Sequence, residues 1–217
     1  AVVFHQKSEK RVTPACEHFG VCGGCKWQHM GYEHQIAYKE QEVLNNLKRI
    51  GHIELPEVTP IAAAPEAYFY RNKMEFSFSD SRWLTPEEIQ EKDTIEDRNA
   101  LGFHIPGMWD KILDIKKCHL QADPSNEMRL FVKRFAIAEG ITFFNPRNHT
   151  GELRTLMIRT SSNGEYMVLI QFCENNESNR IKLLEAIKNQ FPSITSLQYV
   201  INQKANDTIY DQEVICF

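Results

Sequence analysis

The sequence predicts an α+β fold, an antiparallel sheet with packed helices, preceded by a cysteine-rich loop and a helix. Alternating apolar residues predict strands that follow one another along the chain, and Asn163-Gly164 between two such runs is a strong hairpin signal. Segments with the helical period of about 3.6 residues separate the strand pairs. Hydrophobic residues make up 42% and charged residues 25% of the chain, the balance of an ordinary globular protein.

The N-terminal part is predicted to contain a loop and one helix. Residues 1–12 are expected to be the end of a strand followed by a basic turn, and residues 13–31 a loop rich in Cys, Gly and His. A helix is expected from Tyr32 to about Ile50, and Gly51 is expected to end it. Its apolar residues share one face: Ile36, Val43, Leu44, Leu47 and Ile50. Three prolines predict an extended linker over residues 53–69.

The middle of the chain predicts a hairpin with a long tip. Residues 70–79 alternate as a strand does, and one side carries Met74, Phe76 and Phe78. Residues 80–99 are acidic and polar, which favours an exposed insertion at the hairpin tip over a mimic of an anionic partner. The returning strand, a turn and a short strand leading to Cys118 are expected at Leu101–Ile105, Pro106-Gly107 and Lys111–Ile115.

Helices and strands alternate in the C-terminal part. A helix is expected over Pro124–Gly140, a hairpin from Leu153–Thr160 and Glu165–Cys173, and a second helix capped by Ser178 and ending near Phe191. Strands at 194–202 and 208–216 follow. The helices are expected to contribute these apolar contacts: Met128, Leu130, Phe131, Phe135, Ile137, Ile181, Leu184, Ile187 and Phe191.

Charge and composition narrow the class of protein. The net charge of −4 is not typical of a nucleic-acid binder, so any RNA-binding surface would be a local patch. No apolar run approaches the roughly 18 residues of a membrane span, and the first residues do not resemble a signal peptide. We therefore expect a cytoplasmic protein without a membrane partner, in which the six cysteines stay reduced. The abrupt start and end predict a piece of a longer chain.

Four cysteines form the most informative pattern. Cys16, Cys22 and Cys25 have the spacing C-x5-C-x2-C, and Cys118 is a distant fourth after a strand. Gly23 and Gly24 allow a tight turn and let backbone N–H groups approach the sulfurs. The spacing fits structural zinc and an iron–sulfur cluster about equally well, and unligated structural or redox cysteines are the remaining alternative.

The other candidates for ligands are weaker. His18, His29 and His119 lie beside these cysteines and could replace one, although each is more typical of a polar loop. Cys173 and Cys216 lie in apolar strand patterns, which predicts small core residues.

A family resemblance favours iron. Residues 11–51, RVTPACEHFGVCGGCKWQHMGYEHQIAYKEQEVLNNLKRIG, closely resemble the cluster-binding segment of the RNA uracil-5-methyltransferases, and are most similar to the bacterial 23S rRNA (uracil-5-)-methyltransferases. YRNKMEFSFS, LGFHIPGMWDKILDIKKCHLQ and HTGELRTLMIRT continue the resemblance in order along the chain. The resemblance implies that Cys16, Cys22, Cys25 and Cys118 hold a [4Fe–4S] cluster.

The resemblance also implies a domain organisation. Residues 1–12 would end an OB-like TRAM domain, residues 13–53 would form the cluster loop and its helix, and residues 54–217 would form a central α+β domain that recognises RNA. Members of the family bind S-adenosylmethionine in a C-terminal Rossmann-like domain that also carries a catalytic cysteine, and a flipped-out uracil is their target. We expect a monomer that binds 23S rRNA.

This chain departs from the family pattern in its catalytic part. It lacks a glycine-rich S-adenosylmethionine loop after a strand and a Ser-Cys-Asn-Pro-like segment, so the nucleophile's role is not transferred to Cys173 or Cys216. The fragment alone is expected to be inactive, and its cluster to be structural and to help position RNA, with redox sensing less favoured. A stand-alone iron–sulfur or zinc RNA-binding module is the alternative, and a ferredoxin-like electron carrier is less favoured.

Basic and aromatic residues are the candidates for RNA contact. They are Lys10, Arg11, Lys26, Trp27, His29, Arg71, Lys73, Arg154 and Arg159. Trp27 beside Lys26 pairs a stacking surface with a phosphate-seeking charge, although packing over the cluster is an equal alternative for Trp27. Arg71 and Lys73 share the side of their strand opposite Met74, where an ordinary solvated sheet face is the alternative.

Overall fold

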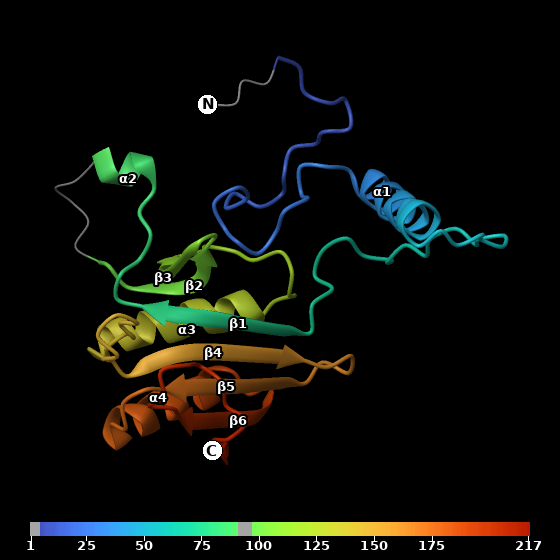
Figure 1. Ribbon diagram of the computed structural model, residues 1–217. Helices are drawn as coiled ribbons and strands as arrows, with labels where there is room; N and C mark the ends of the chain where they lie inside the picture. The colour runs from blue at the N-terminus through green and yellow to red at the C-terminus, as the bar shows by residue number, and fades with distance from the viewer. Residues whose placement is uncertain (1–4, 91–96) are drawn as a thin grey trace.

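A seven-stranded sheet forms the centre of the computed structural model, which describes residues 5–90 and 97–217 (Figure 1). Its strands are β1 (Lys73–Ser79), β2 (Ala100–Ile105), β3 (Met108–Leu113), β4 (Leu153–Thr160), β5 (Tyr166–Phe172), β6 (Ile194–Ile201) and β7 (Ile215–Cys216). The helices are α1 (Tyr32–Asn45), continued by the π-helical turn η1 (Asn46–Ile50), α2 (Pro86–Gln90), α3 (Ser125–Ala138) and α4 (Glu177–Gln190).

The sheet order is β3-β2-β1-β4-β5-β6-β7, which confirms the α+β class. Neighbouring strands are antiparallel except β5 and β6, which are parallel and are joined through α4. The sheet is therefore mixed, whereas the sequence predicted antiparallel pairing. The hairpin expected at Asn163-Gly164 is confirmed, because Thr160 pairs with Tyr166 and Gly164 adopts the positive φ of 85° that such turns require.

The core lies between one face of the sheet and the helices α3 and α4. Met74, Phe76 and Phe78 point into it, as their alternation predicted, and are at most 3% exposed. They belong to one buried cluster with Met128 of α3 and Leu184 of α4. On the opposite face of β1, Lys73 and Glu75 are exposed, so this end of the strand presents one face to the helices and one outward.

Several predictions for the helices need correction. Asn176, not Ser178, caps α4, because its side-chain oxygen accepts a hydrogen bond from the backbone of Asn179 at the third helical position. Ile137 and Ile181 are exposed. The helices instead bury residues that the apolar pattern did not single out: Arg129, Val132, Ala136 and Leu183.

The N-terminal helix stands beside the sheet rather than within the core (Figure 1). α1 has no buried residue, and Val43 is 57% exposed, so the apolar face seen in the sequence is only partly covered within the described chain. Gly51 has φ −75° and does not adopt the left-handed conformation expected of a helix stop; His52, with φ 51°, does.

Two further strand predictions are only partly right. The strand expected at 208–216 is reduced to Ile215–Cys216, and Cys216 is exposed rather than a core residue, whereas Cys173 is 5% exposed as expected. Residues 5–12 contain one isolated bridge, from Arg11 to Met30, in place of a strand end. Residues 1–4 lie outside the described chain.

The acidic segment 80–99 does connect the antiparallel strands β1 and β2, as predicted. Its described part includes α2, and Glu88 accepts hydrogen bonds from Arg82 at 2.9 Å and from the backbone of Thr85. The acidic residues Glu91, Asp93 and Glu96 lie outside the described residues. Among those described, no helix has the length and apolarity that crossing a bilayer requires.

Candidate metal centre and nucleic-acid surface

Cys16, Cys22, Cys25 and Cys118 line one small cavity at the junction of the N-terminal loop and the sheet. The cavity is walled by apolar side chains from three parts of the chain: Phe19, Phe103, Ile115 and Leu120. The fold therefore brings Cys118 to the three cysteines of the loop, although a long stretch of chain separates them.

The first turn of α3 holds Cys118 in place. The Cys118 N–H donates to Oδ1 of Asn126 at 2.7 Å, and Nδ2 of Asn126 donates to the Cys118 carbonyl at 3.1 Å. Asn126 is 5% exposed. One amide side chain thus satisfies both backbone groups of this cysteine and fixes the direction of its side chain.

The cysteine-rich loop is docked onto the sheet by its own residues. His18 Nε2 accepts a hydrogen bond from the Lys116 N–H at 2.8 Å, and Glu17 pairs with the Lys116 ammonium at 3.0 Å. A side chain at Gly23 would place its Cβ 2.8 Å from the carbonyl oxygen of His104 in β2, so the close approach of loop and strand requires glycine. His18 therefore joins the loop to the segment that carries Cys118.

The environment of the sulfurs suits a positively charged metal group. The Gly24 N–H donates to Sγ of Cys22 at 3.4 Å, as expected from the double glycine. Burial raises the pKa values of the Cys16, Cys22 and Cys118 thiols, and the neighbouring cysteines raise them further. Because thiolates this close repel one another, an ionised set would need a bound cation to offset the charge.

The donor set fits an iron–sulfur cluster in chemistry, with four cysteine sulfurs around one cavity. Within residues 5–90 and 97–217, no three His, Cys, Asp or Glu side chains stand close enough together to hold a single metal ion. His119 lines the cavity but contacts the rings of Tyr68 and Phe69, and His18 is occupied with Lys116.

Arg129 is a buried charge that the sequence analysis did not predict. It is fully buried, and its guanidinium donates to the carbonyls of Leu101 at 3.0 Å and Lys116 at 2.8 Å. Burial lowers the pKa of Arg129 to about 10, and Asp114 and Cys118 partly oppose that shift, so it stays protonated at neutral pH. The signal in the sequence was the position of Arg129 among the apolar residues of this helix, next to Met128 and three residues before Val132, both of which are buried.

Five of the RNA-binding candidates lie on or near the cysteine-rich loop. Lys26 and Trp27 are exposed, and the Lys39 ammonium stands 5.3 Å from the centre of the Trp27 ring. Arg11 is exposed and Lys10 donates to the hydroxyl of Tyr38, whereas His29 is half-buried beside the Phe19 ring. These residues form one group on the N-terminal side of the molecule.

Three other candidates lie at one end of β1 and β4. Lys73 and Arg159 are directly opposite each other across the two strands, and both are exposed. Arg71 is exposed just before β1. Lys73 also pairs with Glu75 at 3.0 Å, which reduces the local positive charge.

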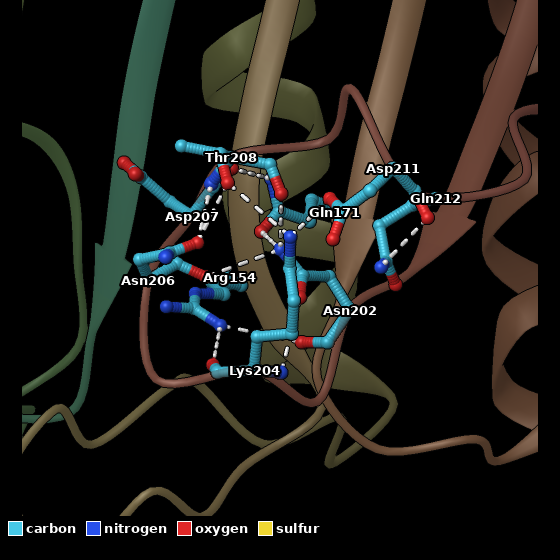
Figure 2. A network of polar contacts seen from close by, with 9 residues as sticks. All are labelled: Arg154, Gln171, Asn202, Lys204, Asn206, Asp207, Thr208, Asp211 and Gln212. Atoms are coloured by element: carbon cyan, nitrogen blue, oxygen red, sulfur yellow. Dashed lines mark hydrogen bonds and ion pairs between the residues drawn. The ribbon is translucent and has the colours of Figure 1, made fainter.

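Arg154 has a different environment from the other candidates. It is 6% exposed, and its guanidinium donates to the backbone carbonyls of Asn202 and Lys204 (Figure 2). The guanidinium also donates to the carbonyl of Ala205 at 3.1 Å. It also stacks over Phe144 at 4.7 Å. The Arg154 guanidinium is thus occupied with backbone carbonyls, unlike the exposed candidates, and its contact with RNA stays a prediction.

Comparison with known proteins shows that the chain is similar to part of proteins described as RNA methyltransferases. No family model matches it. It is 51% identical to an uncharacterized RNA methyltransferase of Porphyromonas gingivalis and 50% identical to one of Bacteroides thetaiotaomicron, with the whole chain aligned in both cases. The chain covers 48% of each relative, so it is homologous to about half of an RNA methyltransferase.

The fold resembles part of a solved enzyme of that class. The structure is the tRNA (uracil-54, C5)-methyltransferase of Pyrococcus abyssi in complex with S-adenosyl-L-homocysteine. The match has a TM-score of 0.61 and 25% identity, and covers 95% of this chain and 41% of that enzyme.

Proposed function

We propose that this chain is the cluster-bearing, RNA-recognising region of an S-adenosylmethionine-dependent RNA uracil-C5 methyltransferase. One observation carries the proposal: in a homologue of RNA methyltransferases, the four cysteines of the motif line a single cavity. The structural match to an enzyme that acts on uracil C5 of tRNA supports the reaction class.

Cys16, Cys22, Cys25 and Cys118 are the proposed ligands of a [4Fe–4S] cluster. When bound, the cluster would supply four metal–sulfur bonds that join the loop to the segment after β3. Transfer of a methyl group to an activated uracil requires no electron from it. Asn126 and His18 would hold the ligand-bearing segments in position for this structural role.

The methyl transfer itself is assigned to the other half of such an enzyme. The S-adenosylmethionine site and the nucleophile are proposed to lie there, because the chain covers only about half of its relatives. This region would bind and orient the RNA. We propose a monomeric cytoplasmic enzyme whose substrate is 23S rRNA, the RNA of the family branch that the cysteine segment resembles.

Metal analysis tests the cluster. Protein purified without oxygen is expected to contain about four iron and four sulfide per chain and to absorb near about 400 nm. Cys16→Ser, Cys22→Ser, Cys25→Ser and Cys118→Ser should each lose most of this iron, while the exposed Cys216→Ser keeps it. Stoichiometric zinc without iron in the native protein would reject the cluster and favour the zinc RNA-binding module.

Methylation assays test the reaction and the RNA. The longer protein that contains this region is offered 23S rRNA and tRNA with labelled S-adenosylmethionine, and modified nucleosides are separated. 5-Methyluridine in 23S rRNA is expected. 5-Methyluridine in tRNA alone would reject 23S rRNA as the substrate but keep the proposed reaction. Methylation of another base would reject the proposed reaction.

A further inference from the structure

A broad groove of about 720 Å³ lies next to the cysteine cavity. Its walls come from residues 24–31 of the cysteine-rich loop, the N-terminal half of α1 and residues 64–70 of the linker. Gly24 and Cys25 line both the groove and the cavity of the four cysteines, so the two sites share a wall. The volume is in the range of small-ligand sites in proteins.

Four aromatic side chains line this groove. Trp27 is 41% exposed and Tyr70 is 59% exposed, and Tyr32 and Tyr68 also line it. Exposed rings that cluster in one patch mark an interaction site, whereas a single exposed ring does not. Flat rings accept the face of a nucleobase, whichever base it is.

Two lysines stand among these rings. Lys26 and Lys39 both line the groove, and the Lys39 ammonium lies 5.3 Å from the centre of the Trp27 ring. Glu66 adds one carboxylate. Cations beside a stacking surface suit a ligand that has both a planar base and a phosphate. A nucleotide has both groups, whereas a segment of protein has neither.

Hydrogen bonds within the protein fix the walls of the groove. Gln35 Nε2 donates to the carbonyls of Trp27 at 3.1 Å and Met30 at 2.9 Å, which ties the loop to α1. The hydroxyl of Tyr32 accepts a hydrogen bond from the Ala64 N–H at 2.9 Å, which ties α1 to the linker. A preformed site costs less ordering entropy when its ligand binds.

The linker side is fixed to the segment after Cys118. The N–H of Phe69 donates to the carbonyl of His119 at 2.9 Å, and the N–H of Arg71 donates to that of Leu120 at 2.8 Å. Phe69 adopts φ 57°, a conformation uncommon outside glycine. Strain of this kind concentrates at functional sites, and Phe69 lies between Tyr68 and Tyr70, which both line the groove.

We propose that this groove binds one unpaired nucleotide of the RNA, with its base stacked on Trp27 and its phosphate near Lys26 and Lys39. The inference rests on the proposed function and adds to it a site for a nucleotide outside the duplex. Paired bases are stacked within their helix and offer no free face, so single-stranded or looped RNA is the ligand class.

Binding of labelled RNA tests the groove. A fluorescent single-stranded RNA of about ten nucleotides and its duplex are titrated with the metal-loaded chain. Trp27→Ala should weaken binding of the single strand about tenfold and leave duplex binding almost unchanged. Trp27→Phe should retain most of the affinity, and Trp109→Ala, at a tryptophan that is 64% exposed on β3, serves as the matched control.

Photo-crosslinking gives a second readout that does not depend on affinity. When the single-stranded RNA carries 5-iodouridine and is irradiated with the protein, the crosslinked peptides are expected to contain Trp27 or Tyr70. If Trp27→Ala binds the single strand as tightly as the native chain does, or loses equal affinity for the single strand and the duplex, the proposed nucleotide site is wrong. The proposed function would still stand. If the native chain binds neither RNA, both the groove and the RNA-recognition function fail.

Discussion

At the scale of single residues, Asn126 shows how one side chain can position a proposed ligand. It is nearly buried and makes both backbone hydrogen bonds of Cys118. A buried amide group that loses its partner costs about 1–3 kcal/mol, which is more than the net value of an ordinary hydrogen bond. Asn126 therefore matters more for stability and for Cys118 than its short side chain suggests.

Asn126→Ala is expected to lower the free energy of unfolding by about 2 kcal/mol and to reduce iron retention, because Cys118 loses its anchor. Urea unfolding and iron analysis on the same samples measure both effects. The control is Asn148→Ala, at an exposed asparagine of the loop after α3. Equal iron content in Asn126→Ala and native protein would show that Cys118 does not depend on this clamp.

At the scale of elements, the segment between β6 and β7 is held by side chains rather than by a strand ladder. Arg154 donates to three of its backbone carbonyls. Gln171 donates to the carbonyl of Asp207, and Asn202 is fully buried beside them (Figure 2). This network holds the chain in an irregular course where the sequence predicted a strand at 208–216.

Arg154→Ala should release this segment. It leaves three carbonyls without their donor, so we expect a loss of about 2–4 kcal/mol in unfolding free energy and faster hydrogen exchange over residues 203–214. Arg159→Ala is the matched control, since Arg159 lies on the same strand but is exposed. Similar exchange in the two variants would mean that Arg154 does not hold the segment.

At the scale of the whole molecule, a negative net charge coexists with local positive patches. Lys73 and Arg159 adjoin each other on the sheet face opposite the helices, while the formal net charge is −4. Phosphates respond to the local patch, because ionic screening limits the reach of charges elsewhere to about 10 Å. The sheet face is therefore compatible with RNA despite the overall charge.

The double variant Lys73→Glu, Arg159→Glu is expected to weaken RNA binding and to reduce the salt slope of the binding constant by about 1.4, the value for two lost contacts to single-stranded phosphates. Titrations at several salt concentrations measure the slope. Arg134→Glu with Lys188→Glu changes the net charge equally on exposed positions of α3 and α4. Equal slopes for both double variants would remove the sheet face from the proposed surface.

Local patterns were sufficient for much of the secondary structure. The β4–β5 hairpin follows from Asn163-Gly164 and the flanking alternation, and the inward face of β1 follows from Met74 and Phe76, because turn geometry and side-chain alternation act over a few residues. The cysteine pattern likewise singled out four residues that line one cavity, and their role as ligands stays a prediction. The metal that they would bind, and the RNA that this region would recognise, stay predictions.

The tertiary structure decided what depends on distant partners. It placed β1 beside β4, left much of the apolar face of α1 exposed, buried Arg129 and Arg154 against carbonyls, and formed the groove around Trp27. Burial and hydrogen bonding of a side chain depend on which segments pack against it, and residue type alone does not specify that packing. The sequence by itself thus determined the hairpin, the strand faces and the candidate ligands, and only packing between remote segments determined which of the cations remain available to a partner.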